Sequence, residues 1–301
     1  MKAAVVLLLL AAACLAAPLY ASAVSGTDPF RTNPLGQVEV RGRLQPVLAE
    51  GPGGLGTEPV GPGLRGPYLL GADSLGRDVA ARVLYGGRTS LLVAGGATLL
   101  CLVLGGLAGV LAGAVGGWLD SVLSGVLDLL WAFPVTLLAI SLALVLVGAP
   151  LRLGPFSIAG DSSVLTVLVL GLVYVPYVAR PVRAELVALR TAPVIEAARA
   201  TGGTPGHILR RHMLPQLWPL LAGLGPIVAA TMLLTEAALS VLGLGVQAPG
   251  ASWGTLIADG QALLYQRPMV AVAPGLAVVV TVVALNALGE GLERRQGGRE
   301  G

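Results

Sequence analysis

Apolar residues fill long stretches of this sequence, and the polar residues gather between them. A helix needs about 20 predominantly apolar residues to cross a bilayer, and six stretches approach or exceed that length. They cover residues 3–23, 90–115, 127–148, 164–179, 217–239 and 269–288. The fourth stretch is short, and we expect its helix to continue into residues 180–190. The pattern predicts an all-α polytopic membrane protein with about six transmembrane helices.

The main polar interruption is EAARATGGTPGHILRRHMLP, residues 196–215, which carries several arginines. Pro193 suits the first turn of a helix, where a missing N–H costs nothing, and Glu196 suits the positive end of the helix dipole. Alanines favour helix up to Gly202 and Gly203, which are typical of helix ends. We therefore expect a short helix that begins near Pro193.

A second short helix is predicted directly after the glycines. Thr204 is a suitable N-cap residue, and Pro205 would occupy the first helical position. Pro215 is expected to end this helix, because proline cannot donate to the helical ladder. Two short helices joined by a glycine bend, with Arg199, Arg210 and Arg211 pointing outward, suit a surface that docks another protein.

Between the first two apolar stretches lies a long polar segment. Residues 36–67 are rich in glycine and proline and show no apolar periodicity, so we expect irregular structure there. Residues 74–88 read as an amphipathic helix at the outer membrane surface. The predicted organisation is a first transmembrane helix (1–23), an extracytoplasmic loop with this amphipathic helix (24–89), a transmembrane domain (90–290) and a cytoplasmic tail (291–301).

Composition supports a membrane protein, since 55% of residues are hydrophobic, only 12% are charged and the mean hydropathy is +0.82. Arginines follow the fourth stretch and lie near the C-terminus, and Lys2 lies near the N-terminus. The positive-inside rule therefore puts both termini in the cytoplasm. The loop at 24–89 has seven arginines and opposes this trend, but long loops contribute weakly to the rule. A cleaved signal peptide is the alternative for residues 1–23, because Ala21-Ser22-Ala23 resembles a cleavage site.

Four separated segments carry a resemblance to a known family. They are GADSLGRDVAARVLYGGRTSLLVA, GGWLDSVLSGVLDLLWAFPVTLLAI, EAALSVLGLGVQAPGASWGTLIADG and PGLAVVVTVVALNALGEGL, in addition to the segment at 196–215. That segment is similar to the EAA signature of the membrane subunits of ABC importers. Together they resemble the C-type permease subunit of dipeptide, oligopeptide and nickel importers, over about residues 70–292.

The resemblance implies a permease that moves a solute by alternating access in a bacterial inner membrane. It implies partnership with a second homologous permease, two ATPase subunits that bind ATP and Mg²⁺, an extracytoplasmic solute-binding protein and membrane lipid, with no nucleic acid. The residues that would contact the ATPases are those that match the signature. They are Glu196, Ala197, Ala198 and Gly202, with Leu214 and Pro215 fixing the helix that follows.

The chain lacks the residues for its own ATP chemistry. Lys2 is its only lysine, whereas a P-loop needs a lysine after a glycine-rich turn to hold the phosphates. We therefore expect no enzymatic activity and no cofactor in this chain. His207 and His212 are five residues apart, which does not aim both at one metal, and Cys14 and Cys101 lie in apolar stretches as small core residues.

Two further positions are candidates for the translocation path or its outer gate. Glu236 is an ionisable residue near the end of the fifth stretch, and such residues are functional candidates. A structural role is its alternative. Trp253 lies in the loop after that stretch, where the alternative is an aromatic anchor at the membrane interface.

Glycines recur every fourth residue in the second stretch, at Gly105, Gly109, Gly113 and Gly117. This leaves a helix stripe without side chains, where a neighbouring helix can approach closely. We expect a packing seam within the subunit, and a seam between subunits is the alternative.

Two other classes of protein remain as alternatives to an importer subunit. An ion-coupled secondary transporter would work without ATPases but needs charged groups at mid-membrane, and Glu236 is nearly the only one predicted there. A membrane-embedded hydrolase needs a nucleophile and base, and both histidines fall in the polar loop. The sequence does not identify the solute, and peptides are the first choice ahead of nickel chelates, opines or sugars.

Overall fold

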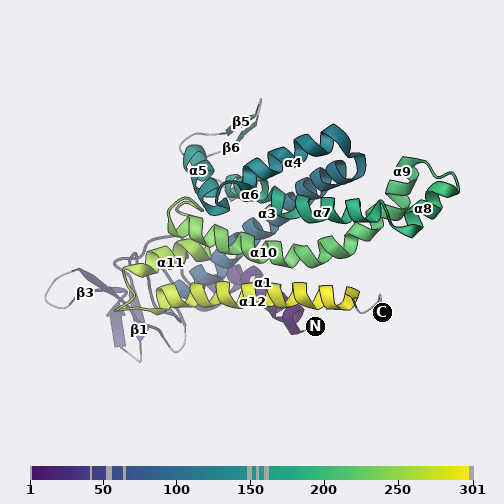
Figure 1. Cartoon of the computed structure of the whole chain (residues 1–301). Helices are drawn as coiled ribbons and strands as arrows, with labels where there is room; N and C mark the ends of the chain where they lie inside the picture. Colours follow the sequence, from purple (N-terminus) through teal and green to yellow (C-terminus); the bar gives the residue numbers. More distant parts are fainter. Residues whose placement is uncertain are drawn as a thin grey trace.

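The computed structural model describes residues 2–40, 43–51, 56–63, 66–147, 151–153, 156–158 and 163–297. Long helices run side by side in one elongated bundle, with short β-hairpins at one end and two short helices at the other (Figure 1). The prediction of an all-α membrane protein is confirmed, and the hairpins are a small addition to it.

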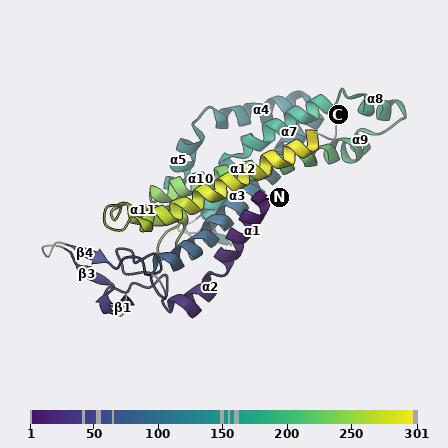
Figure 2. The ribbon, with the colours of Figure 1, turned by 90° about the horizontal axis from the view of Figure 1, so that it is seen from below.

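The longest helix, α3 (Val79–Val115), is the centre of the bundle. It packs against α6 (Ser163–Val173), α7 (Val175–Leu189), α10 (Leu217–Val241) and the N-terminal helix α1 (Lys2–Leu15). On the other side of α10 lie α11 (Trp253–Gln261) and α12 (Met269–Gly297). Seen from below, α12 runs across α10 and α3, and α1 lies beside α3 (Figure 2).

Among the described residues, four helices are long and apolar enough to cross a membrane, and two bent pairs raise the possible number of spans to six. The four are Val79–Val115, Ser163–Leu189, Pro205–Val241 and Met269–Arg294. In the first bent pair, α1 continues through α2 (Ala17–Tyr20) and a π-helical turn (Ala21–Ser25) with a bend of 49°. The predicted count of about six therefore agrees with the structure.

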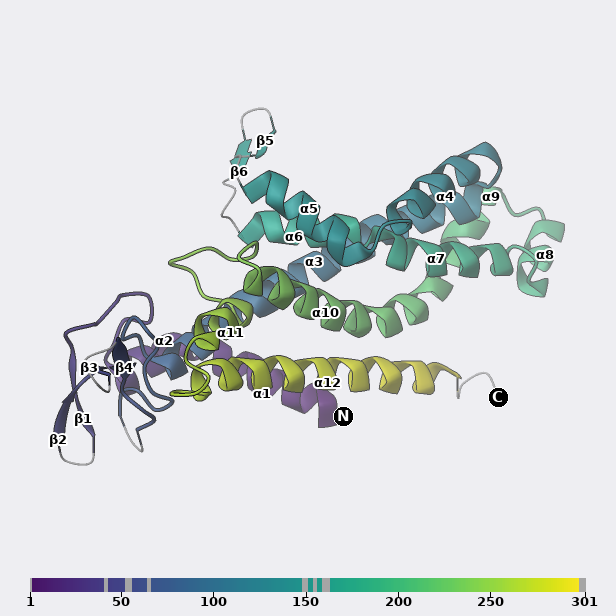
Figure 3. The same cartoon turned by 60° about the vertical axis from the view of Figure 1, so that its left-hand side comes forward.

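The second bent pair corrects the predicted third span at 127–148. The chain forms α4 (Gly117–Trp131) and α5 (Val135–Val147), which meet at an angle of 85°. Pro134 explains the break, because it donates no N–H and disfavours helical backbone in the residue before it. Figure 3 shows α4 lying beside α7 while α5 turns away toward α6.

The start of the central helix also differs from the prediction. The amphipathic helix expected at 74–88 and the span expected at 90–115 are one helix, so the predicted boundary at residue 89 falls inside α3. Asp78 caps it by accepting hydrogen bonds from the N–H groups of Ala80 at 2.9 Å and Ala81 at 3.3 Å. This cap satisfies N–H groups that the first turn leaves unpaired.

The glycine-rich loop is not irregular throughout, as the sequence predicted. Antiparallel strands β1 (Gln37–Val40) and β2 (Arg43–Pro46) pair with Gln37 opposite Pro46, and β3 (Leu48–Glu50) and β4 (Thr57–Pro59) pair with Leu48 opposite Pro59. Buried side chains hold the hairpins together, namely Val38, Val47, Val60, Tyr68 and Ala72. A third hairpin joins β5 (Leu151–Leu153) to β6 (Phe156–Ile158).

The glycine stripe of α3 is a packing seam against α7. A Cβ atom at Gly105 would lie 2.7 Å from the Cβ of Val178, and one at Gly109 would lie 2.6 Å from the carbonyl oxygen of Ala179. At Gly113 the nearest atom would be the Cβ of Leu186, at 2.8 Å. The expected seam within the subunit is therefore present. Gly117 is the exception, because it is the first residue of α4 and a Cβ atom there would have nothing within 4 Å.

Candidate functional site

The polar segment at 193–216 projects from one end of the bundle as two short helices. Helix α8 (Pro193–Ala200) begins with Pro193 in its first turn, and α9 (Pro205–Ile208) begins with Thr204 at the N-cap position. Both helix starts agree with the sequence prediction. The side chain of Thr204 makes no capping hydrogen bond, so its extended backbone alone marks the boundary.

A left-handed glycine turn reverses the chain between the two helices. Gly202 has a φ of +85°, a conformation that residues with a Cβ rarely adopt. Its N–H donates to the carbonyl of Arg199, and the N–H of Gly203 donates to the carbonyl of Ala198, both at 3.0 Å. These are the two hydrogen bonds of a Schellman motif, which closes a helix C-terminus.

Pro215 does not end the second helix, which corrects the prediction. From α9 the chain continues through a π-helical turn (Leu209–Met213) and a 3₁₀ turn (Leu214–Gln216) directly into α10. Pro215 has no N–H to donate. The π-helical turn and the 3₁₀ turn beside it use other hydrogen-bond patterns than an α-helix, so the helix continues past the proline. The segment at 205–216 is thus joined to the long helix α10 by unbroken helical turns.

Buried apolar side chains fix the two short helices to the bundle. Ile195, Ile208 and Met213 are all buried in the main hydrophobic core. Their role was not singled out from the sequence. Each has an apolar neighbour in the chain, namely Val194, Leu209 and Leu214, so the sequence alone does not show which residue of each pair packs inward.

The residues predicted to contact a partner lie around these anchors. Glu196, Ala197 and Gly202 are exposed on the tip of the projection, together with Leu214 and Pro215 at its base. Ala198 is half-buried and packs toward the core. The structure therefore brings Glu196, Ala197 and Gly202 to one exposed tip, while Ala198 supports it.

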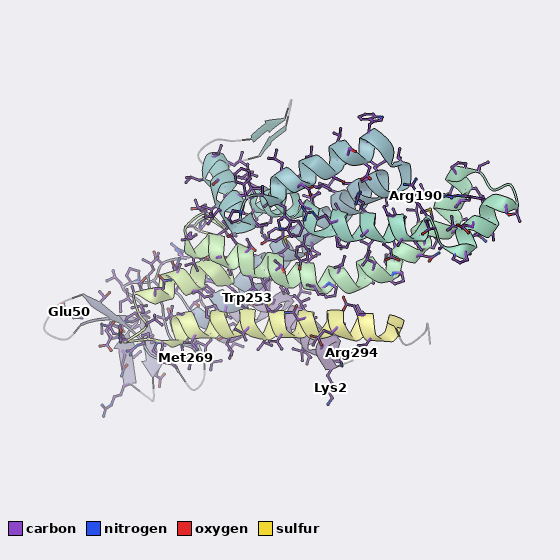
Figure 4. All side chains as sticks on the ribbon, in the orientation of Figure 1. Lys2, Glu50, Arg190, Trp253, Met269 and Arg294 are labelled. Atoms are coloured by element: carbon purple, nitrogen blue, oxygen red, sulfur yellow. The ribbon has the colours of Figure 1, made fainter. Side chains whose placement is uncertain are left out.

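A cavity of about 530 Å³ lies between the projection and the end of α3. Arg190 and Arg199 line it, together with Val115, Gly203 and Met213 among others. Figure 4 shows Arg190 at this end of the bundle, where α7 meets the short helices. Within the described part of the chain, no group of three His, Cys, Asp or Glu side chains could hold a metal ion.

Glu236 lies in a buried hydrogen-bond network, far from solvent. Its carboxylate accepts hydrogen bonds from Ser90 at 2.9 Å and from Ser240 at 2.8 Å. The hydroxyl of Ser90 accepts a hydrogen bond from the backbone N–H of Trp253 at 3.0 Å, so the network joins α3, α10 and α11. This network shows a structural contact for Glu236, and its role in the translocation path stays a prediction.

Trp253 is buried, with an exposed fraction of 1%, which contradicts the alternative of an aromatic anchor at the membrane interface. Its indole N–H donates to the carbonyl of Val83 at 2.9 Å, and its ring lies against Gly87 of α3. The ring lies inside the bundle, between α11 and α3 (Figure 4). A role at an outer gate remains a prediction for this residue.

Two ion pairs between α4 and α7 were missed as a candidate site. Asp120 accepts two hydrogen bonds from Arg183, at 2.5 and 2.8 Å, and Asp128 accepts one from Arg180 at 2.6 Å. From the sequence, we paired neither aspartate with an arginine. The sequence does show two aspartates in the segment that forms α4 and two arginines in the segment that forms α7. It does not show that these two helices are neighbours, so the pairs could not be predicted.

Comparisons with known proteins agree on one family. Residues 105–298 match the family described as binding-protein-dependent transport system inner membrane component. A putative peptide permease protein of Brucella ovis is 38% identical over 227 residues, which cover 75% of this chain and 71% of that protein. The dipeptide transport system permease protein DppC of Alkalihalophilus pseudofirmus is 34% identical over 76% of this chain and 72% of its own length.

The glutathione transport system permease protein GsiD of Pectobacterium atrosepticum is 35% identical over 75% of this chain and 70% of its own length. Among solved structures, an inward-facing form of the MetNI methionine ABC transporter aligns with a TM-score of 0.56 and 21% identity, over 71% of this chain and 95% of that one. An amino acid ABC transporter has a TM-score of 0.54 and 18% identity, over 71% and 94%. At these identities the structural match concerns the fold alone.

Proposed function

Because the chain belongs to the family of binding-protein-dependent transport inner membrane components, we propose that it couples ATP hydrolysis in separate subunits to solute movement through the exposed tip at 193–204. The chain is a permease component of an importer. Its own residues supply a path and a docking surface, and covalent chemistry is assigned to its partners.

The observation that carries the proposal is the construction of the tip. Exposed Glu196, Ala197 and Gly202 lie on a projection whose underside is fixed by buried Ile195 and Ile208. The projection continues through unbroken helical turns into α10. A movement imposed on the tip is therefore passed to a membrane helix, as alternating access requires.

The proposed assembly contains a second homologous permease, two ATPase subunits that bind ATP and Mg²⁺, and an extracytoplasmic solute-binding protein. The tip at 193–204 faces the cytoplasm, and so do both termini. The hairpins at 37–59 then face outward in a bacterial inner membrane, where the binding protein approaches. The charge pattern supports this orientation, because Arg199, Arg210 and Arg211 lie exposed on the tip side.

Short peptides are the proposed solute class. Three relatives support it by their names, which specify peptide, dipeptide and glutathione permeases. Glutathione is itself a small peptide-like molecule, so one chemical class covers all three names.

Co-purification tests the coupling role. We expect the tagged chain, expressed with its partner subunits and extracted in mild detergent, to retain the ATPases. Glu196→Arg should lose them, because it reverses a charge on the exposed tip. Glu39→Arg makes the same charge change on an exposed residue of β1 at the other end of the molecule and should retain them. Equal recovery of ATPases with wild type and Glu196→Arg would contradict the proposed docking surface.

A further inference from the structure

An ion pair on α4 and α7 lies deep along helices that belong to the membrane region. Trp118, the second residue of α4, is 77% exposed, as expected of a tryptophan near a membrane interface. Asp128 follows ten residues later in the same helix, which is about 15 Å at 1.5 Å per residue. Asp128 lies within the bent candidate span formed by Gly117–Trp131 and Val135–Leu146, and Arg180 lies within the candidate span Ser163–Leu189.

The ion pair is exposed on the surface of the subunit. Asp128 and Arg180 are joined at 2.6 Å, with exposed side-chain fractions of 66% and 41%. Charged groups at the bilayer centre are costly when they face lipid, and they face water-filled cavities or other protein instead. This surface is therefore covered by something other than lipid.

Aromatic rings extend the same surface. The guanidinium of Arg180 lies 4.3 Å from the ring centroid of Trp131, and the rings of Trp131 and Tyr177 stack with centroids 6.1 Å apart. The stacked rings hold the arginine head in one place through a cation–π contact. The cluster of Asp128, Trp131, Tyr177 and Arg180, which we call the mid-membrane cluster, thus presents both charges and two flat rings.

The break between α4 and α5 gives independent support. It directly follows Trp131 and bends the chain by 85°. Irregular backbone at membrane depth is tolerated where it is buried in protein or lines a water-filled cavity, because lipid cannot satisfy its polar groups. Phe133 in the break is 54% exposed, so the break is not buried within this subunit.

Another side of α4 is suited to lipid or to a second permease. Trp118, Val122, Val126 and Leu129 form an exposed apolar stripe at helical spacing. At about 100° per residue, Asp128 is turned by about 80–160° from these four residues and lies beside the stripe. The polar and apolar sides of α4 are therefore distinct, and the mid-membrane cluster belongs to the polar one.

We propose that the mid-membrane cluster lines the solute path and contacts short peptides in their zwitterionic form. This inference rests on the proposed function. Arg180 complements a terminal carboxylate, Asp128 complements a terminal ammonium group, and the rings offer a surface for varied side chains. A path that carries both charges accepts peptides of different sequence, because every peptide has these two ends.

Thiol labelling tests whether the cluster is in the path. Cys14 and Cys101 are first replaced by alanine, and single cysteines are introduced by Tyr177→Cys and, as the matched control on the apolar stripe, Val122→Cys. The probe is an anionic, membrane-impermeant methanethiosulfonate. The probe reacts only with the thiolate, which forms where the cysteine is in contact with water. If the cluster lines a water-filled path, the cysteine of Tyr177→Cys should react at least about tenfold faster than that of Val122→Cys in the reconstituted importer.

Trapping the ATPases with ATP and vanadate should change the rate at Tyr177→Cys several-fold and leave the control unchanged. Equal rates at the two positions, or a rate at Tyr177→Cys that ignores the nucleotide state, would overturn the assignment to the path. If the chain had no ATPase partners, no nucleotide effect would be seen at any position and no ATPase would co-purify. Failure of the proposed function is thereby separated from failure of this inference.

A charge exchange tests the contact with solute. The double variant Asp128→Arg and Arg180→Asp keeps an ion pair but reverses its direction, and its assembly is checked by co-purification. The probe is a tryptic digest of casein, with uptake into proteoliposomes measured by mass spectrometry. We expect the exchange to change the set of imported peptides and to raise KM by about fivefold or more, whereas a purely structural pair would leave both unchanged. An unchanged set and KM would overturn the solute contact.

Discussion

At the scale of single residues, Ile195 shows how a small anchor supports an exposed site. It is fully buried, while Val194 next to it is 51% exposed. Glu196 and Ala197 follow directly and face solvent. The position of the exposed tip is therefore set by a side chain that faces away from it.

The burial of Ile195 predicts the effect of removing its side chain. Ile195→Ala should weaken the attachment of α8 by about 2–5 kcal/mol, because it removes a buried side chain and leaves a cavity. Limited trypsin digestion in detergent should then cleave faster after Arg199, since the loop opens more often. Val194→Ala removes a comparable but exposed side chain and should digest like wild type. Equal digestion of the two variants would contradict the role of Ile195.

Single residues also show where sequence reasoning ends. The left-handed turn at Gly202 and the helix start at Pro193 could be predicted, because local backbone preference decides both. The surroundings of Trp253 could not. Whether a tryptophan after a transmembrane helix faces lipid or packs inward depends on α3, which is more than 130 residues away in the chain.

At the scale of helices, the seam between α3 and α7 is defined by absent side chains. Gly109 leaves space for the backbone of Ala179, and Gly106, three residues earlier, faces open space. Small residues at four-residue spacing allow such close helix contact in membranes. The sequence predicted the seam from this spacing, but the helix that fills it became clear only in the fold.

The seam predicts opposite effects for one substitution at two sites. Gly109→Ala should lower stability by about 1–3 kcal/mol, because its methyl group would force the helices apart. Gly106→Ala has room for the methyl group and should raise stability by up to about 1 kcal/mol, since alanine favours helix over glycine. The midpoint of thermal unfolding in detergent measures both effects. A Gly109→Ala midpoint at or above that of wild type would contradict the close packing.

The helix breaks were the least predictable elements. Two prolines gave opposite outcomes, because α4 and α5 separate at Pro134 while α9 continues past Pro215 into α10. Proline removes one hydrogen bond in both cases. At Pro215, adjacent π and 3₁₀ turns let the helix continue, and at Pro134 they do not. Whether such turns form depends on tertiary packing, which the local sequence pattern does not show.

At the scale of the whole molecule, the bundle separates two kinds of surface. The hairpins and the ion pairs that join Asp73, Arg77, Arg82 and Asp259 lie at one end, and the tip at 193–204 lies at the other. Between them, α10 runs from the tip to Glu236, whose hydrogen bonds reach α3 and, through Ser90, α11. The helical turns at 205–216 and α10 thus form a continuous helical segment between the tip and the hydrogen-bond network around Glu236.

The central claim is that ATP hydrolysis in partner subunits drives transport through the tip. Its most direct test is uptake of a casein digest into proteoliposomes that contain the whole importer, with ATP hydrolysis measured in the same sample and no ion gradient. Gly202→Leu should hydrolyse ATP but import little. The side-chain position at residue 202 is open, but leucine disfavours the left-handed turn by about 1–2 kcal/mol. Gly202→Asn tolerates that turn and serves as the matched control.

The account predicts ATP-dependent uptake by wild type and Gly202→Asn, and hydrolysis with little uptake by Gly202→Leu. Uptake by Gly202→Leu at the wild-type ratio of peptide to ATP would contradict coupling through the tip. Uptake by the purified chain alone, driven by a proton gradient, would contradict the account as a whole.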